Sequence, residues 1–162
     1  MTSPRSKHLV IGVGNEFRSD DAVGLVVARS LSKLNPDNCD ILESSGEGAG
    51  LIHLWEGYDD VILIDAVKSG RKVGALHTVD VSDEEIPAEQ MHFSSHSFGV
   101  AEAIEVARAL GCLPARLTIY GVEVGSIEPG VDLTTDVRGA AGELVHRIMA
   151  AIDSHSRKDI HN

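Results

Sequence analysis

Two short apolar runs constrain the fold more than any other feature of this sequence. His8–Val13 ends in a glycine-rich loop, and Val61–Asp65 is bounded by Asp59-Asp60 and a turn. Runs of this length and continuity are typical of strands buried inside a sheet. Between them, Asp21–Leu34 repeats apolar residues at helical spacing. The chain therefore begins as strand, helix and strand rather than as a bundle or an all-β domain.

The rest of the chain continues this alternation. Further strands are expected at 40–43, 75–81 and 117–124, and further helices at 51–55, 98–110 and 134–152. The order β-α-β-α-β-β-α-β-α predicts an α/β fold, one three-layer domain with a twisted, mostly parallel sheet and helices on both faces. We expect this domain to span residues 1–162, with a polar tail from about residue 154.

Composition narrows the range of partners. The 162 residues are an ordinary length for one domain, and their formal net charge is −11. Such a surface repels phosphate backbones and anionic bilayers, so we expect neither nucleic acid nor membrane as a partner. No apolar run approaches the ~20 residues that span a bilayer, and the polar, basic start does not resemble a signal peptide. We expect a cytoplasmic protein with Cys39 and Cys112 as free thiols.

The loop after the first strand disfavours nucleotide binding. A dinucleotide fingerprint requires a third glycine where this chain has Phe17. Asp20 and Asp21 then precede the first helix, where their charges would repel a phosphate. We expect Asp20 to cap this helix. Asp21 is left either as an acidic residue of the first helical turn or as a ligand.

Two further polar residues are expected near Asp21. Asp65 ends the second apolar run, and His96 precedes the helix expected at 98–110. Each alone is compatible with an ordinary turn or loop residue. Ligands of parallel sheets collect where the strands end, so the three side chains together suggest a metal site. Carboxylate and imidazole suit nickel or zinc, and three protein ligands leave coordination positions open.

Other catalytic patterns are absent from the sequence. There is no G-x-S-x-G elbow, no H-E-x-x-H helix and no cysteine in a recognisable nucleophile context. His53, His77 and His146 are interpreted as structural or solvated residues. His92 is the exception, because its loop is close in sequence to the expected site.

Four motifs occur in a fixed order along the chain. They are Gly12-x-Gly14-Asn15 with Asp20, Asp21 and Gly24; Asp65-Ala66; Ser94-x-His96-x-x-Gly99; and Gly121-x-Glu123 with Leu133-Thr134. In this order and spacing, from His8 to about Ile152, the sequence resembles the hydrogenase maturation proteases. It departs from them at Ala22, Val73 and Val124, none of which is a proposed ligand.

This resemblance implies a specific activity. It implies an endopeptidase that removes a C-terminal peptide from the precursor of a nickel-iron hydrogenase large subunit after nickel insertion. It also implies that Asp21, Asp65 and His96 bind nickel, delivered within the substrate, with other divalent ions able to substitute. The cleavage step is open between a metal-polarised carbonyl and aspartyl-type activation of water.

Two other functions fit part of the pattern. A non-catalytic nickel-binding maturation factor would share the metal site but leave the precursor uncut. A nucleotide- or small-molecule-binding α/β domain would use the same edge of the sheet for a different ligand. The loops at 14–19, including Glu16, and 82–93 are expected to shape a peptide groove.

Overall fold

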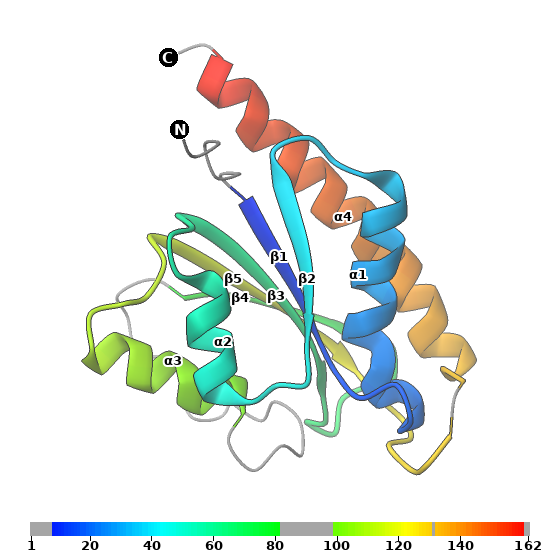
Figure 1. Ribbon diagram of the computed structural model, residues 1–162. Coiled ribbons are helices and arrows are strands. Elements are labelled where there is room, and N and C mark those ends of the chain that lie inside the picture. Colours follow the sequence, from blue (N-terminus) through cyan, green and yellow to red (C-terminus); the bar gives the residue numbers. More distant parts are fainter. Residues whose placement is uncertain (1–7, 82–98, 131, 161–162) are drawn as a thin grey trace.

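The computed structural model describes residues 8–81, 99–130 and 132–160, with side chains described as far as Ser154 (Figure 1). Its elements are β1 His8–Val13, η1 Ser19–Ala22, α1 Val23–Leu34, β2 Cys39–Ser44, α2 Gly48–Trp55, β3 Asp60–Val67, β4 Leu76–Asp80, α3 Val100–Ala109, β5 Arg116–Glu123 and α4 Thr135–Ile160. The helix α4 continues past residue 154, where the sequence predicted a polar tail.

The five strands form one sheet in the order β2-β1-β3-β5-β4. The first four run parallel to their neighbours, and β4 adds to the edge in the antiparallel direction. Every residue of β1 and β3 is buried, which is why these two strands read as continuous apolar runs. The parallel strands all end at the same edge of the sheet, at the bottom in Figure 1.

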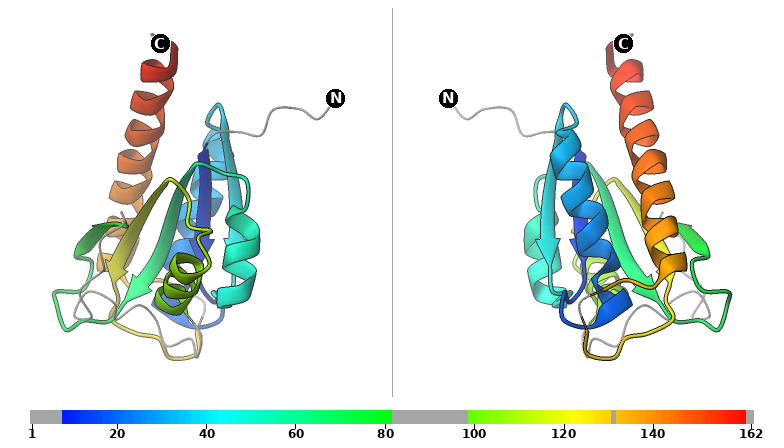
Figure 2. Two further views of the ribbon diagram at one scale, coloured as in Figure 1. Left: turned by 90° about the vertical axis from the view of Figure 1, so that its left-hand side faces the viewer. Right: turned by 90° about the vertical axis from the view of Figure 1, so that its right-hand side faces the viewer.

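Helices cover both faces of the sheet. Figure 2 shows α2 and α3 on one face, with α1 and α4 on the other. Successive residues of β3 alternate between the two cores: Val61 and Leu63 pack toward α2 and α3, whereas Ile62 and Ile64 pack toward α1 and α4. The predicted fold class, a three-layer α/β arrangement with a mostly parallel sheet, is confirmed.

Two sequence expectations about the surface can be compared with this fold. Both cysteines are free and half-buried, and burial raises the pKa of the Cys39 thiol to about 12. In the part of the chain that the structure describes, no helix combines the length and apolar character needed to cross a bilayer.

The start of α1 lies against the strand ends with no side chain between them. A Cβ atom added at Gly24 would stand 2.2 Å from the carbonyl oxygen of Val13 and 2.5 Å from that of Ile64. Both oxygens belong to the backbone, so neither can rotate away. Gly24 therefore allows α1 to approach the end of β1 and the middle of β3 more closely than any other residue would permit.

We expect Gly24→Ala to destabilise the protein by about 3 kcal/mol, because the new methyl group must displace backbone of two central strands. Gly139→Ala is the matched control, since Gly139 lies on the exposed side of α4 with no atom within 4 Å of its added Cβ. That control should stabilise the fold by up to about 1 kcal/mol through helix propensity. Urea unfolding of both variants measures the difference. Equal free energies of unfolding would contradict the close packing at Gly24.

Candidate active site

The candidate site lies at the edge where the parallel strands end. The loop 14–18 leaves β1 there and leads into the single 3-10 turn η1, which packs against β3. Asp20 and Asp21 lie in η1, and both are buried. The sequence predicted a helix starting at Asp21, but α1 starts at Val23, so both carboxylates precede it.

Asp20 is not the N-cap that the sequence suggested. Its side chain makes no capping bond to η1 or α1. Instead, its Oδ2 accepts hydrogen bonds from the amides of Gly125 and Ser126, at 3.0 and 3.1 Å. Thr134 donates its amide to Oδ1 at 2.7 Å and its hydroxyl to Oδ2 at 2.9 Å. Because the 3-10 turn precedes α1, Asp20 lies outside that helix and binds the chain that joins β5 to α4.

The same connecting segment holds the preceding loop residues. The Arg18 Nε donates to the Ile127 carbonyl at 3.1 Å, and the Ser19 hydroxyl donates to the Glu128 carbonyl at 2.8 Å. The Ser19 amide donates to the Gly130 carbonyl at 3.0 Å. Ser19 has a φ of 51°, which side-chain-bearing residues rarely adopt. These bonds hold the backbone at Ser19 in this conformation and so fix the positions of the next residues, Asp20 and Asp21.

Asp21 is turned into the protein beside the loop that follows β1. Only 1% of its surface is exposed. Its carbonyl accepts the amide of Asn15 at 3.2 Å, and a Cβ at Gly14 would stand 2.3 Å from the same oxygen. The glycine therefore permits the loop to pass directly over Asp21.

Asp65 is the sixth residue of β3 and is opposite Gly121 of β5. It is completely buried, and its Oδ1 accepts the amide of Ala66 at 2.8 Å. Its neighbour Ile64 contacts the start of α1 at Gly24, three residues after Asp21. The structure thus brings Asp21 and Asp65 to the same edge of the sheet, as the sequence predicted. Buried carboxylates are costly unless they are hydrogen-bonded, paired or metal-bound.

The third predicted ligand, His96, lies outside the described residues, as does His92. Within residues 8–81, 99–130 and 132–160, no three histidine, cysteine or acidic side chains gather as a metal site. The described residues therefore contribute two members of the predicted trio. The assignment of Asp21, Asp65 and His96 as ligands stays a prediction.

A third buried carboxylate, Glu123, lies at the end of β5 and is only 1% exposed. Ser69 donates both its amide, at 2.9 Å, and its hydroxyl to this carboxylate, and the His77 Nε2 lies 3.2 Å from it. Burial favours the neutral acid, but the hydrogen bonds from Ser69 and the contact with His77 outweigh it and lower the pKa of Glu123. The interpretation of His77 as a structural residue agrees with this contact.

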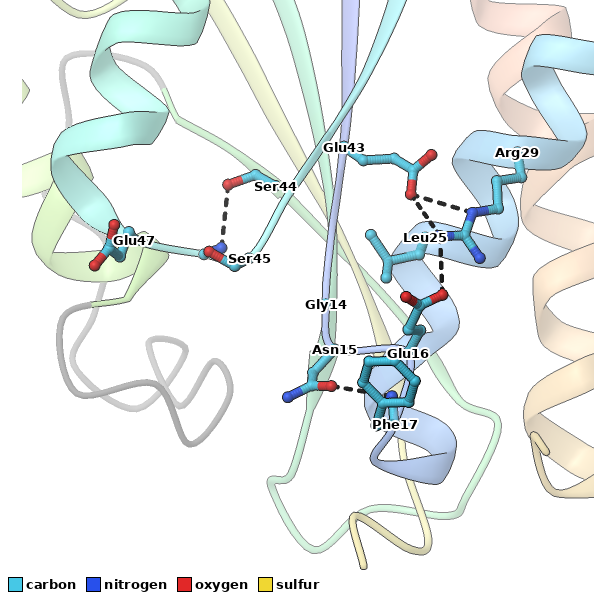
Figure 3. A pocket seen from close by; sticks show the side chains of 11 residues that line it. Gly14, Asn15, Glu16, Phe17, Leu25, Arg29, Glu43, Ser44, Ser45 and Glu47 are labelled. Atoms are coloured by element: carbon cyan, nitrogen blue, oxygen red, sulfur yellow. Dashed lines mark hydrogen bonds and ion pairs between the residues drawn. The ribbon is translucent and has the colours of Figure 1, made fainter. Parts of the chain in front are cut away.

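A pocket of about 700 Å³ opens beside this edge (Figure 3). It lies between the loop after β1, the first two turns of α1 and the segment that joins β2 to α2. Its lining residues are Gly14, Asn15, Glu16, Phe17, Leu25, Arg29, Glu43, Ser44, Ser45, Gly46 and Glu47. The expectation that the 14–19 loop helps to form a groove agrees with this pocket, whereas the 82–93 loop lies outside the described residues.

The charge network in this pocket could not be predicted from the sequence. Arg29 donates from Nε and Nη2 to the Glu43 Oε1, at 3.1 and 2.9 Å, and from Nη2 to the Glu16 Oε2 at 3.3 Å. Arg29 lies on the polar side of a helix, and Glu43 is part of a short strand. Neither position stands out in the sequence, because the three side chains meet only after β1 and β2 pair.

Comparisons with known proteins identify the family. The family model described as "Hydrogenase maturation protease" matches residues 25–151. The "Hydrogenase 2 maturation protease" of Escherichia coli strain K12 is 31% identical over 147 residues, which cover 89% of each chain. The chain belongs to the hydrogenase maturation protease family.

Solved structures of family members share the fold. The hydrogenase maturating endopeptidase HybD from E. coli superposes with a TM-score of 0.74 at 25% identity, over 92% of this chain and 93% of that one. The solution structure of an endopeptidase from E. coli gives a TM-score of 0.78 at 29% identity, with the same coverage. The resemblance seen in the sequence is confirmed. The chain is a peptidase of hydrogenase maturation, which favours the predicted enzyme over the non-catalytic and nucleotide-binding alternatives.

We expect Asp20→Ala to destabilise the protein by about 3 kcal/mol, because it leaves three amides and one hydroxyl without their buried acceptor. Asp37→Ala removes an exposed carboxylate at the other end of β2 and should change the free energy of unfolding by no more than about 0.5 kcal/mol. Chemical denaturation compares the two. A loss for Asp20→Ala as small as that of the control would mean that Asp20 does not hold the connecting segment.

The lowered pKa of Glu123 predicts how stability depends on pH. The group stabilises the fold fully above its ordinary pKa of 4.5, and this contribution is lost as the pH falls through the lower pKa of the folded chain. We expect the unfolding free energy of Glu123→Gln to fall less steeply below pH 4.5 than that of the unaltered protein. Denaturant titrations at a series of pH values measure the two slopes. Parallel curves would contradict the ionised hydrogen-bonded carboxylate.

Proposed function

We propose that this endopeptidase removes a C-terminal peptide from the nickel-loaded precursor of a nickel-iron hydrogenase large subunit. Membership of the hydrogenase maturation protease family supports a hydrogenase precursor as substrate. The observation that carries the proposal is the pair of buried carboxylates, Asp21 and Asp65, at one edge of the sheet next to an open pocket. A peptidase needs such an arrangement of polar groups beside a surface on which a polypeptide can lie.

Nickel enters this proposal as part of the substrate. Asp21 and Asp65 supply oxygen ligands, and His96 supplies a nitrogen ligand, to a nickel ion that the precursor already holds. Carboxylate and imidazole are suitable donors for nickel, and other divalent ions of similar preference can occupy the same set. Binding through the metal would let the enzyme distinguish a loaded precursor from an empty one. The site therefore acts as a checkpoint before cleavage.

Cleavage adds water to the scissile carbonyl carbon, breaks the carbon–nitrogen bond and transfers a proton to the leaving amine. Two routes are compatible with the residues. The substrate's nickel can polarise the carbonyl oxygen, or an aspartate of the pair can accept a proton from the attacking water. The second route is the aspartyl-type mechanism. In both routes the burial of Asp21 and Asp65 strengthens their electrostatic effect on the reacting atoms.

We expect Asp65→Asn and Asp21→Asn each to lower kcat/KM for the nickel-loaded precursor by at least about 100-fold, since the neutral amide neither binds the metal strongly nor accepts the proton. Asp60→Asn is the matched control on the same strand. Asp60 is buried at the other end of β3, where it lies 3.2 Å from the His8 Nδ1, so its loss should affect stability but not turnover. Intact mass of the precursor after incubation measures the cleavage.

The same assay compares precursor with and without inserted nickel. Loss of a C-terminal peptide from the loaded precursor alone is the expected result. Normal cleavage by Asp65→Asn would exclude both routes in which this residue takes part. Equal cleavage of loaded and empty precursor would retain the peptidase but remove the nickel checkpoint. No cleavage of a verified cognate, nickel-loaded precursor would overturn the proposed function.

The cellular location belongs to the same proposal. Hydrogenase maturation enzymes that act on a metal-loaded precursor must meet it where the metal is inserted, and the acidic composition with two free thiols fits a reducing cytoplasm. Fractionation of cells that produce the protein tests this expectation.

A further inference from the structure

A loop at the edge of the candidate site is strongly basic. Residues 68–72, the basic loop, follow the end of β3 and include Lys68, Arg71 and Lys72. No other stretch of five residues in this chain, whose net charge is −11, holds three lysines or arginines. Because Lys68 follows Asp65 by three residues, the basic loop lies at the edge where the parallel strands end.

The cations of the basic loop are exposed and uncompensated. All of its residues are exposed at the surface. Within the part of the chain that the structure describes, Lys68, Arg71 and Lys72 make no ion pair, whereas Arg29 and Arg147 each pair with a glutamate. Three positive charges therefore face solvent together, and they create a local positive potential on an acidic protein.

The buried carboxylate of Glu123 holds the start of the basic loop. Ser69 donates its amide, at 2.9 Å, and its hydroxyl to this carboxylate, which is almost completely buried. The backbone next to it is fixed as well, since the Val124 amide donates to the Val67 carbonyl at 3.0 Å. An exposed segment of this kind would otherwise be free to move, so a buried charge of the fold is used to fix its shape.

The residues that follow fix the other end of the basic loop. The Gly74 amide donates to the Glu123 carbonyl at 2.8 Å, so the same residue binds both ends. Val73 is half-buried and packs against the core between the sheet and α4. A Cβ atom added at Gly74 would stand 2.9 Å from the Asp136 carbonyl oxygen, which shows how closely this end lies against the start of α4. The cations are thus carried by a backbone that is anchored on both sides.

The position and rigidity of the basic loop indicate the kind of partner that it fits. Figure 2 shows the segment after β3, in green, projecting at the end of the molecule where the parallel strands finish. A projecting loop can contact the body of a protein bound at this edge. Anchored charges favour a partner whose own charges are fixed, because neither side then loses much conformational freedom on binding. A folded surface with carboxylates has such charges, whereas a free C-terminal tail does not.

We propose that the basic loop docks against a patch of carboxylates on the folded body of the precursor and so orients the precursor at the site. The inference rests on the proposed function, which supplies the precursor as the partner. Arg71 and Lys72 are the principal contacts, since they lie midway between β3 and β4. Complementary charge of this kind increases the rate and the specificity of association, and it leaves the chemical step unchanged.

Steady-state cleavage of the nickel-loaded cognate precursor by charge variants tests this docking. Arg71→Glu/Lys72→Glu should raise KM at least about tenfold with kcat changed less than about twofold, because it weakens binding rather than the chemical step. Lys33→Glu/Arg147→Glu is the matched control. It makes the same change of net charge at the end of α1 and in the middle of α4, and should change KM less than about twofold. Thermal melting verifies that both variants are folded.

The salt dependence of KM separates docking by charge from a structural role of the loop. For the unaltered enzyme, KM should rise as NaCl is increased from about 50 to about 300 mM, because salt screens the attraction. For Arg71→Glu/Lys72→Glu, KM should fall over the same range, because salt then screens a repulsion. Equal salt dependence of the two enzymes would contradict the proposal.

Two altered precursors identify where the carboxylates lie. A precursor in which carboxylates of the docking patch are replaced by lysine should be a poor substrate for the unaltered enzyme and a better one for Arg71→Glu/Lys72→Glu, since the charges are then exchanged. A precursor whose removed C-terminal segment has its acidic side chains replaced by amides should keep the KM of the natural precursor. A raised KM for that second precursor would place the carboxylates in the removed segment and overturn docking on the folded body.

The remaining outcomes distinguish this inference from the function on which it rests. If the unaltered enzyme cleaves the precursor and Arg71→Glu/Lys72→Glu has the same or a lower KM, the docking role is overturned while the peptidase function stands. An equal rise of KM in the control would mean that net charge, and not the basic loop, sets the affinity, and this also overturns the docking role. Absence of cleavage by the unaltered enzyme overturns both.

Discussion

The buried carboxylate of Asp20 holds together three parts of the chain that are distant in sequence. It joins the turn η1 to Gly125 and Ser126 after β5, and to Thr134 before α4. Four donors compensate the burial of this carboxylate, so separating the segments would break all four hydrogen bonds. Because Asp21 follows Asp20 directly in η1, these bonds also fix the position of Asp21. Of the two adjacent aspartates, Asp20 thus has a structural role and Asp21 is a candidate ligand.

Much of the fold could be read from the sequence because its strongest signals are local. The apolar runs of β1 and β3 are strands buried on both faces, and their length and continuity leave few alternatives. The proximity of Asp21 and Asp65 followed from the rule that parallel strands end at one edge. The role of Asp20 did not follow, because its partners lie more than 100 residues away and no local pattern shows that they bind it. An acidic residue before a helix looks like a cap, and only the tertiary structure shows the 3-10 turn that redirects it.

The charged residues of the pocket are a second group whose arrangement could not be predicted from the sequence. Glu16, Arg29 and Glu43 are unremarkable in the sequence, and each alone would be a solvated side chain. They become a network because β1 pairs with β2 while α1 packs across both. Exposed ion pairs of this kind contribute little to folding, typically ~0.2–1 kcal/mol. Their main effect is therefore on the electrostatic potential of the pocket, which belongs to binding rather than to stability.

The contact of Gly24 with Val13 of β1 and Ile64 of β3 has a consequence for the rigidity of the proposed site. The carbonyl groups of Val13 and Ile64 lie directly against the start of α1, so backbone packs on backbone close in sequence to Asp21 and Asp65. Such a backbone contact has no side-chain rotamers to change and encloses little free volume, so it resists deformation. The entropy of fixing the two carboxylates is lost when the chain folds and not again when a substrate arrives. Recognition at the proposed site would thus be preorganised, with the incoming polypeptide adapting its geometry to the enzyme.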